Sequence, residues 1–213
     1  MSSLWLVRNV ASAIGAAESD ILFVSGGTEV SLIFFFSNTD CNLLKLVFIQ
    51  ANNLVIWTAL EHYRRLREKG EANEAVPHII TSNVEHDAVA LPLKHYEGRG
   101  LALVDYVAVS NLTGRVDCET VIGAIRPNTC LVSIMLANNE TGILMPVAPL
   151  FSSLKEINLQ REKQGMCRIL LHSDAAQAIG KVPVDVRELS VDYLTIVGHK
   201  VSYCLFPRIP FIF

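Results

Sequence analysis

Short apolar runs alternate along this chain with longer stretches that have the spacing of helices. The runs are nearly continuous rather than alternating between polar and apolar residues, which is typical of strands that are buried on both faces. Strands that alternate with helices predict an α/β fold, in which a mostly parallel sheet lies between helices in a three-layer α/β/α arrangement. The expected strands are 21–24, 78–81, 101–109, 131–136, 169–171 and 193–197, and the expected helices are 52–69, 88–95, 118–125 and 147–163.

Composition narrows the class of protein. The chain has 213 residues, of which 51% are apolar and 18% charged, so it can bury a real core and is not expected to be disordered. The formal net charge of -3 comes without any basic stretch interleaved with aromatic residues, and we therefore expect no nucleic-acid partner.

Cysteine spacing and hydropathy suggest a cytosolic protein. The five cysteines are scattered, with no C-x-x-C pair and no histidine at ligand spacing, which favours reduced thiols and no metal site. Residues 1–7 lack the basic start of a signal peptide. Residues 30–50 carry two apolar runs, but the polar residues 37–42 separate them, so we expect no membrane span.

Polar clusters follow several of the expected strands. The carboxyl ends of parallel strands meet at one edge of a sheet, where ligands of α/β proteins bind. We therefore expect the clusters to converge on one crevice. They are residues 25–29, 83–87, 138–141, 173–177 and 198–200.

Two of these clusters carry the most specific chemistry. A lysine just past a buried strand, here Lys200, can have its amine pKa lowered enough to attack an aldehyde carbon. An aspartate that ends an apolar strand, here Asp174, is costly to bury without a cationic partner and can hold a pyridinium nitrogen protonated. Together they predict a pyridoxal phosphate site. The alternatives are a surface lysine and a helix N-cap aspartate.

The other clusters are less specific by themselves. The glycines of residues 26–27 could let backbone N–H groups approach an anion, or could form an ordinary tight turn. His86 could lie flat against an aromatic ring, or be a hydrogen-bonded loop histidine. Asn138 and Asn139 could donate to a phenolate oxygen or simply form a turn. Gln177 could reach the same oxygen or face solvent.

Taken together, the motifs at 25–29, 84–86, 137–142, 172–177 and 197–200 resemble the class V aminotransferase family of fold-type I pyridoxal phosphate enzymes. The resemblance covers 21–29 and 51–200, which is about half of a family member, and it implies the large domain of such an enzyme. Within the family, the sequences of these motifs are most similar to those of the selenocysteine lyases, which split selenocysteine into alanine and selenide. Cysteine desulfurases are the alternative. The resemblance also implies a homodimer and a small-molecule substrate.

The resemblance assigns roles to individual residues. It implies that Lys200 is the catalytic lysine that forms a Schiff base with the coenzyme, that Asp174 pairs with the pyridinium nitrogen, and that His86 stacks on the ring as a second catalytic residue.

Five more positions would bind the coenzyme by the same resemblance. Asn139 and Gln177 would contact the ring oxygen. Gly27, Thr28 and His199 would hold the phosphate.

Two segments depart from the family pattern. Residues 30–50 have no counterpart in it, and residues 201–213 differ from the family's continuation. We therefore expect a partial coenzyme-binding large domain at 1–200 with a foreign insertion at 30–50, followed by a non-family tail at 201–213. None of the five cysteines matches the thiol that receives selenium in the family, so we expect this chain to be inactive alone or a non-catalytic fragment.

Overall fold

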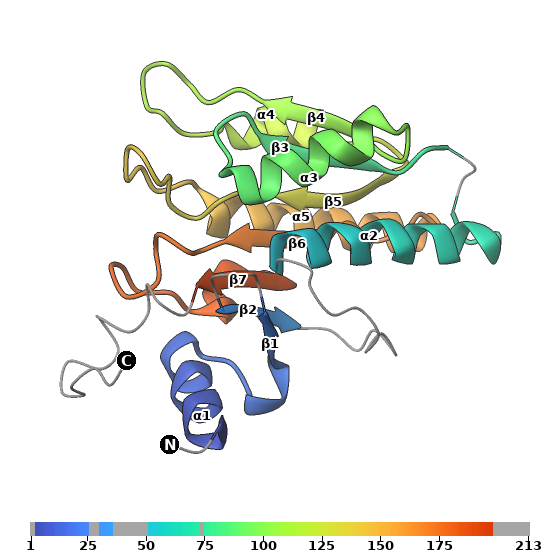
Figure 1. Cartoon of the computed structure of the whole chain (residues 1–213). Coiled ribbons are helices and arrows are strands. Elements are labelled where there is room, and N and C mark those ends of the chain that lie inside the picture. The colour runs from blue at the N-terminus through green and yellow to red at the C-terminus, as the bar shows by residue number, and fades with distance from the viewer. Residues whose placement is uncertain (1–2, 26–29, 36–50, 73–74, 198–213) are drawn as a thin grey trace.

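The computed structural model describes residues 3–25, 30–35, 51–72 and 75–197. Their strands form one seven-stranded sheet in the order β1-β2-β7-β6-β5-β3-β4 (Figure 1). The strands are β1 (Ile21–Ser25), β2 (Val30–Phe35), β3 (His78–Ser82), β4 (Leu103–Val107), β5 (Thr129–Ser133), β6 (Leu170–Asp174) and β7 (Tyr193–Val197).

The sheet is mostly parallel, as expected. Strands β4, β3, β5, β6 and β7 pair in parallel. Strand β2 is antiparallel to both of its neighbours, β1 and β7. Two antiparallel steps restore the direction, so β1 runs the same way as the five parallel strands.

Helices cover both faces of the sheet, which confirms the three-layer α/β/α arrangement (Figure 1). On one face, α2 (Ala51–Glu68) and α3 (Asp87–Gly98) pack in a shared apolar cluster. The second cluster lies on the other face and includes residues of the remaining α-helices. Those helices are α1 (Ser3–Ile14), α4 (Cys118–Gly123), α5 (Val147–Lys163) and α6 (Val186–Leu189), and a 3-10 turn at Glu18–Asp20 links α1 to β1.

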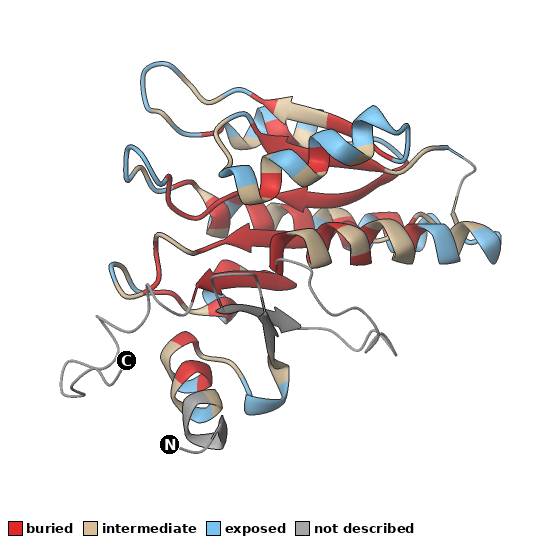
Figure 2. Ribbon diagram, viewed as in Figure 1, coloured by how far each residue is buried: buried red, intermediate tan, exposed pale blue. Residues whose placement is uncertain are grey.

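Four of the five parallel strands have side chains buried on both faces, whereas β4 at the edge is partly exposed. Figure 2 shows β3, β5, β6 and β7 buried along their length. Successive strand residues point to opposite faces, so Ile79 joins the cluster under α2 while Ile80 joins the cluster under α5. This double burial explains why the runs are continuously apolar.

The observed elements agree with the expected ones, with three additions. Helix α5 and strand β7 have the expected bounds, whereas β4 is shorter than the expected 101–109. The elements that sequence reasoning did not anticipate are α1, α6 and β2, the last formed by residues 30–35 of the segment expected to be an insertion. Residues 36–50 and 198–213 lie outside the described part. Within that part, no helix combines the length and apolar character needed to cross a bilayer, and no three metal-ligating side chains gather.

Candidate active site

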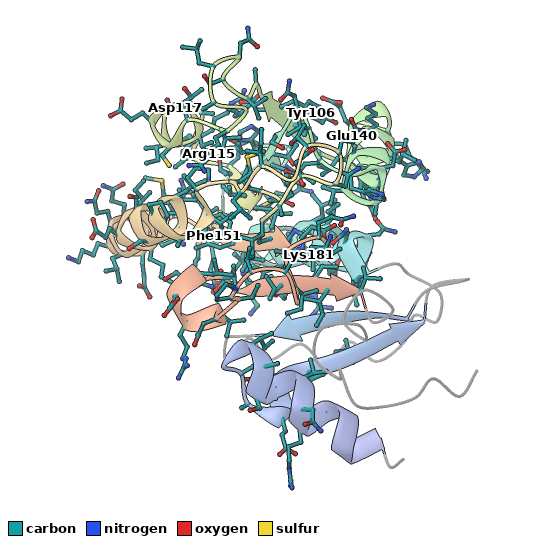
Figure 3. All side chains as sticks on the ribbon, turned by 90° about the vertical axis from the view of Figure 1, so that its left-hand side faces the viewer. Tyr106, Arg115, Asp117, Glu140, Phe151 and Lys181 are labelled. Carbon is teal, nitrogen blue, oxygen red and sulfur yellow. The ribbon has the colours of Figure 1, made fainter. Side chains whose placement is uncertain are left out.

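The carboxyl ends of the parallel strands meet along one edge, and several expected site residues lie there. His86 follows β3, Asn139 follows β5, and Asp174 is the last residue of β6. Figure 3 faces this edge and labels Glu140, from the loop after β5, and Lys181, from the loop after β6. The fold therefore brings the polar clusters of β3, β5 and β6 to one side of the molecule.

Asp174 is held at both of its carboxylate oxygens. The residue is only 7% exposed. Its Oδ1 accepts a hydrogen bond from the backbone N–H of Ala176 at 2.9 Å, and its Oδ2 accepts one from Nδ2 of Asn52 at 2.8 Å. Both donors are neutral, and no described Lys, Arg or His side chain forms an ion pair with it. Turns rather than an α-helix follow Asp174, so it is not a helix N-cap.

His86 is the N-cap residue of α3. Its Nδ1 accepts a hydrogen bond from the backbone N–H of Ala88 at 3.1 Å. A neutral ring that accepts at Nδ1 carries its proton on Nε2, which is left to donate elsewhere. His86 is thus a hydrogen-bonded loop histidine, and its exposed ring also lines a pocket at the edge of the sheet.

That pocket has a volume of about 450 Å³ and lies between the loops after β3, β4 and β5. His86 and Asn139 both line it, as do the three acidic residues Glu85, Asp87 and Glu140. The structure thus brings together two of the residues expected to contact the coenzyme ring.

Asn138 organises the turn that carries Asn139. Its Oδ1 accepts hydrogen bonds from the backbone N–H groups of Glu140, at 3.0 Å, and Thr141, at 2.8 Å. Its Nδ2 donates to the carbonyl oxygen of Val84 at 3.2 Å. Asn138 therefore makes a turn, the alternative considered from the sequence, and also ties the loop after β5 to the loop that precedes α3. Asn139 itself is exposed.

Gln177 lies apart from this pocket. It is half-buried on the turn after β6, where its Oε1 accepts a hydrogen bond from Nζ of Lys181 at 2.7 Å. Gln177 is not among the residues that line the 450 Å³ pocket.

Glu85 is a half-buried acid at the same edge of the sheet, and its carboxyl group is enclosed by the protein. Burial raises the pKa of its carboxyl group to about 8, although hydrogen bonds from the hydroxyl of Ser82, at 2.6 Å, and the N–H of Met135, at 2.9 Å, act in the opposite direction. The negative charge of Asp174 raises that pKa further. The Oε2 atom of Glu85 is buried and has no hydrogen-bond partner among the described residues.

Sequence reasoning missed Asn52 and Glu85 as parts of this site. The contact between Asn52 and Asp174 joins residues 122 positions apart, which no local pattern reveals. A signal existed for Glu85, since a carboxyl group lies beside His86 in the polar cluster 83–87.

Gly27, Thr28, His199 and Lys200 lie outside the described residues. The strands that lead to them are nevertheless described. Val24 of β1 and Val197 of β7 both pair with Ser31 of β2. Neighbouring strands are about 4.8 Å apart, so the two chain paths leave the same edge of the sheet roughly 10 Å from each other.

Comparison with known proteins identifies the family. A family model described as aminotransferase class-V matches residues 66–204. The chain belongs to the class V aminotransferase family. Members of this family, including the selenocysteine lyases and cysteine desulfurases, depend on pyridoxal phosphate.

Relatives of this chain include both kinds of enzyme. The chain is 50% identical over 194 residues to the selenocysteine lyase of Xenopus laevis, a match that covers 90% of this chain and 41% of the relative. It is 37% identical over 194 residues to the cysteine desulfurase IscS of Methanosarcina thermophila, covering 91% and 37%. The solved structure of SspA in complex with cysteine aligns with a TM-score of 0.67 and 28% identity, covering 93% of this chain and 45% of that one. The chain thus spans less than half the length of these relatives.

The described side chains of this chain fit pyridoxal phosphate. A buried carboxylate with only neutral described donors suits the protonated nitrogen of a pyridine ring. In addition, Asn52 Oδ1 and Glu85 Oε2 are buried and have no partner among the described residues, and both residues interact with Asp174. Buried polar atoms without a partner in the protein are a common feature of a ligand site.

Proposed function

We propose that this chain supplies the pyridoxal phosphate-binding part of a selenocysteine lyase, which cleaves the carbon–selenium bond of L-selenocysteine to give L-alanine and, with two electrons from an external thiol reductant, selenide. The observation that carries the proposal is Asp174, a buried carboxylate at the carboxyl end of β6 that has neutral hydrogen-bond donors on both oxygens. The identity to the Xenopus laevis lyase supports selenocysteine as the substrate.

Three side chains would hold the coenzyme ring and its reactive carbon. Asp174 would keep a proton on the pyridine nitrogen, and the bound coenzyme would then withdraw electrons from the amino acid's α-carbon. His86 would lie over the ring from the start of α3, and its Nε2–H would stay available because Nδ1 caps the helix. Lys200 would hold the coenzyme covalently until substrate arrives.

The remaining contacts would fix the coenzyme's other groups. Asn139, which lines the pocket beside His86, and Gln177 would approach the ring oxygen. For Gln177 the donor would be its Nε2, since its Oε1 accepts a hydrogen bond from Lys181. The segments that follow β1 and β7, with Gly27, Thr28 and His199, would hold the phosphate.

Covalent trapping tests the proposal. The chain is incubated with pyridoxal phosphate and reduced with borohydride, and its peptides are analysed by mass spectrometry. We expect the coenzyme on the peptide that contains Lys200, and its loss in Lys200→Ala. Lys163→Ala, which alters an exposed lysine at the end of α5, is the matched control and should keep the label. Label spread evenly over surface lysines would contradict the proposal.

A cysteine desulfurase is the second candidate. It is supported by the 37% identity to the Methanosarcina thermophila enzyme and by the similarity to SspA, whose structure holds cysteine. Titration of the coenzyme-loaded chain with L-selenocysteine and with L-cysteine, followed by the change in coenzyme absorbance, separates the two candidates without turnover, which this chain is expected to lack alone. Tighter binding of selenocysteine supports the lyase, whereas equal or tighter binding of cysteine supports the desulfurase.

We further propose a cytosolic homodimer. The three described cysteines, Cys118, Cys130 and Cys167, are free thiols, which suits a reducing compartment. Sedimentation velocity over a range of protein concentrations tests the dimer, and imaging of the tagged chain tests the compartment. A species of monomer mass at every concentration would rule out the homodimer.

A further inference from the structure

We infer that Asn52 is a positioning residue, which holds the Asp174 carboxylate in the orientation that receives the ring nitrogen of the coenzyme. The inference rests on the proposed coenzyme site. Its observation is the hydrogen bond from Asn52 Nδ2 to Asp174 Oδ2 at 2.8 Å, between two side chains that are buried.

The contact leaves the carboxylate little freedom to rotate. Asn52 lies in the first turn of α2, whereas the other donor, the N–H of Ala176, belongs to the turn after β6. The two oxygens of Asp174 are therefore held from two separate elements. Rotation about the bond from Cβ to the carboxyl carbon would break both hydrogen bonds, each of which has an ionised acceptor and is stronger than a neutral one.

Packing alone does not explain an asparagine at this position. The neighbouring inward positions of α2 are filled by apolar residues such as Val55, Ile56 and Ala59. Asn52 is 3% exposed, and its Oδ1 has no partner among the described residues. Burying an amide with part of its hydrogen-bonding capacity unused is unfavourable, and the bond to Asp174 is the described interaction that offsets this.

The amide also preserves the charge that the coenzyme needs. A lysine or arginine at position 52 would orient Asp174 equally well but would neutralise it. A neutral amide donor orients the carboxylate and leaves its negative charge to pair with the protonated ring. Asn52 thus provides orientation without competing for the ion pair.

Coenzyme titration of four proteins tests the inference: the unaltered chain, Asn52→Ala, Asn52→Asp and Asn53→Ala. We expect Asn52→Ala to weaken pyridoxal phosphate binding about 10-fold or more, since a hydrogen bond to a charged group is lost. Asn52→Asp keeps the shape of the side chain but removes the donor and brings a second negative charge to Asp174, so it should bind at least as weakly. A purely structural role for the side chain's volume would leave Asn52→Asp unaffected.

Asn53→Ala is the matched control. Asn53 accepts a hydrogen bond from the hydroxyl of Tyr96 at 3.3 Å and has no described contact with Asp174. We expect its affinity to stay within about 2-fold of the unaltered chain, because this bond is long and partly exposed. We also expect the absorbance of the bound, ring-protonated coenzyme to fall in Asn52→Ala but not in Asn53→Ala. Equal affinities and equal spectra for the two variants would overturn the inference.

A second measurement needs no coenzyme. In a double-mutant cycle, Asn52→Ala, Asp174→Ala and the double variant are unfolded in urea. We expect the unfolding constant of the double variant to differ about 5-fold or more from the product of the single effects, since the two side chains interact. If the unaltered chain binds no coenzyme, the proposed function fails while the cycle still decides this contact. Additive effects would overturn the inference on their own.

Discussion

The imidazole of His172 and the hydroxyl of Ser133 meet at 2.7 Å inside the sheet, where both residues are fully buried. The other ring nitrogen of His172, Nε2, lies 3.0 Å from Oγ1 of Thr195. The ring therefore bridges three neighbouring strands through neutral hydroxyl groups. Burial lowers the pKa of His172 to about 3, so the ring is neutral in the folded protein at ordinary pH.

This neutral histidine makes stability depend on pH. Between the ordinary histidine pKa of 6.5 and the folded-state pKa of about 3, His172 is protonated in the unfolded chain but not in the folded one. Unfolding then takes up a proton, so this contribution to the free energy of unfolding is lost as the pH falls, by up to about 1.4 kcal/mol per pH unit. Urea unfolding at several pH values should show a shallower acid dependence for His172→Gln. Identical slopes for the two proteins would contradict the lowered pKa.

Glu85 should give the opposite dependence. Its carboxyl group has a pKa of about 8 in the folded protein, compared with an ordinary glutamate pKa of 4.5. The folded state therefore holds more protons between these values, and stability falls as the pH rises through them, by up to about 1.4 kcal/mol per pH unit. Glu85→Gln imitates the protonated acid and should gain stability relative to the unaltered chain from pH 5 to pH 8. A constant difference over that range would argue against a protonated Glu85.

Arg161, near the end of α5, should be important for stability although it forms no described ion pair. Its buried guanidinium donates to backbone carbonyl oxygens of the segments that enter β5 and β6. Replacement by methionine would leave these acceptors unpaired, so we expect a loss of about 3 kcal/mol or more in the free energy of unfolding. The acceptors are the carbonyl groups of Cys167, Arg126, Pro127 and Thr129, at 3.0, 3.0, 2.8 and 3.2 Å.

The control for Arg161→Met is Arg64→Met. Arg64 pairs with Glu61 and Glu68 on the exposed surface of α2. Exposed ion pairs contribute little to stability, so this variant should change the urea midpoint only slightly. Equal midpoints for the two variants would show that the carbonyl contacts of Arg161 are not stabilising.

The side chain of Asn158 pairs with both backbone groups of Ile169, as a neighbouring strand would. Its Nδ2 donates to the carbonyl oxygen of Ile169 at 2.9 Å, and the N–H of Ile169 donates to its Oδ1 at 2.8 Å. Asn158→Ala would leave both buried backbone groups unpaired, at a cost of about 2–4 kcal/mol. Hydrogen exchange at Ile169 should speed up together with the loss of stability. Asn158→Asp keeps the acceptor and should protect that amide better than alanine does.

Much of the fold followed from hydrophobic pattern. Helix α5 and strand β7 have the expected bounds because their apolar residues are continuous or helically spaced and end at polar residues. The pattern overestimated the length of β4, which was expected to span 101–109. Strand β4 lies at the edge of the sheet and pairs with β3 from His78 to Ser82, so its length is set by its partner rather than by its own apolar run.

The site was predictable where its residues follow strands and not where distant segments meet. The positions of His86, Asn139 and Asp174 at one edge follow from parallel topology. The bond from Asn52 to Asp174 depends on how α2 lies across the sheet, which no local pattern encodes. Similarly, Ser133 and His172 are single polar residues in mostly apolar strands, so the sequence does not reveal that they form a buried hydrogen bond.

Strand β2 connects β1 to β7, two strands that lead toward expected site residues. Within the described chain, β1 pairs with the sheet through β2 alone, and β2 pairs with β7 on its other side. Loss of the pairing of residues 30–35 would therefore detach β1, the strand that precedes Gly27 and Thr28. Strands β3 and β6, which lead to His86 and Asp174, would stay in the sheet. One short strand thus sets the spacing between the ends of β1 and β7, the strands that precede the expected phosphate-binding residues and the expected reactive lysine.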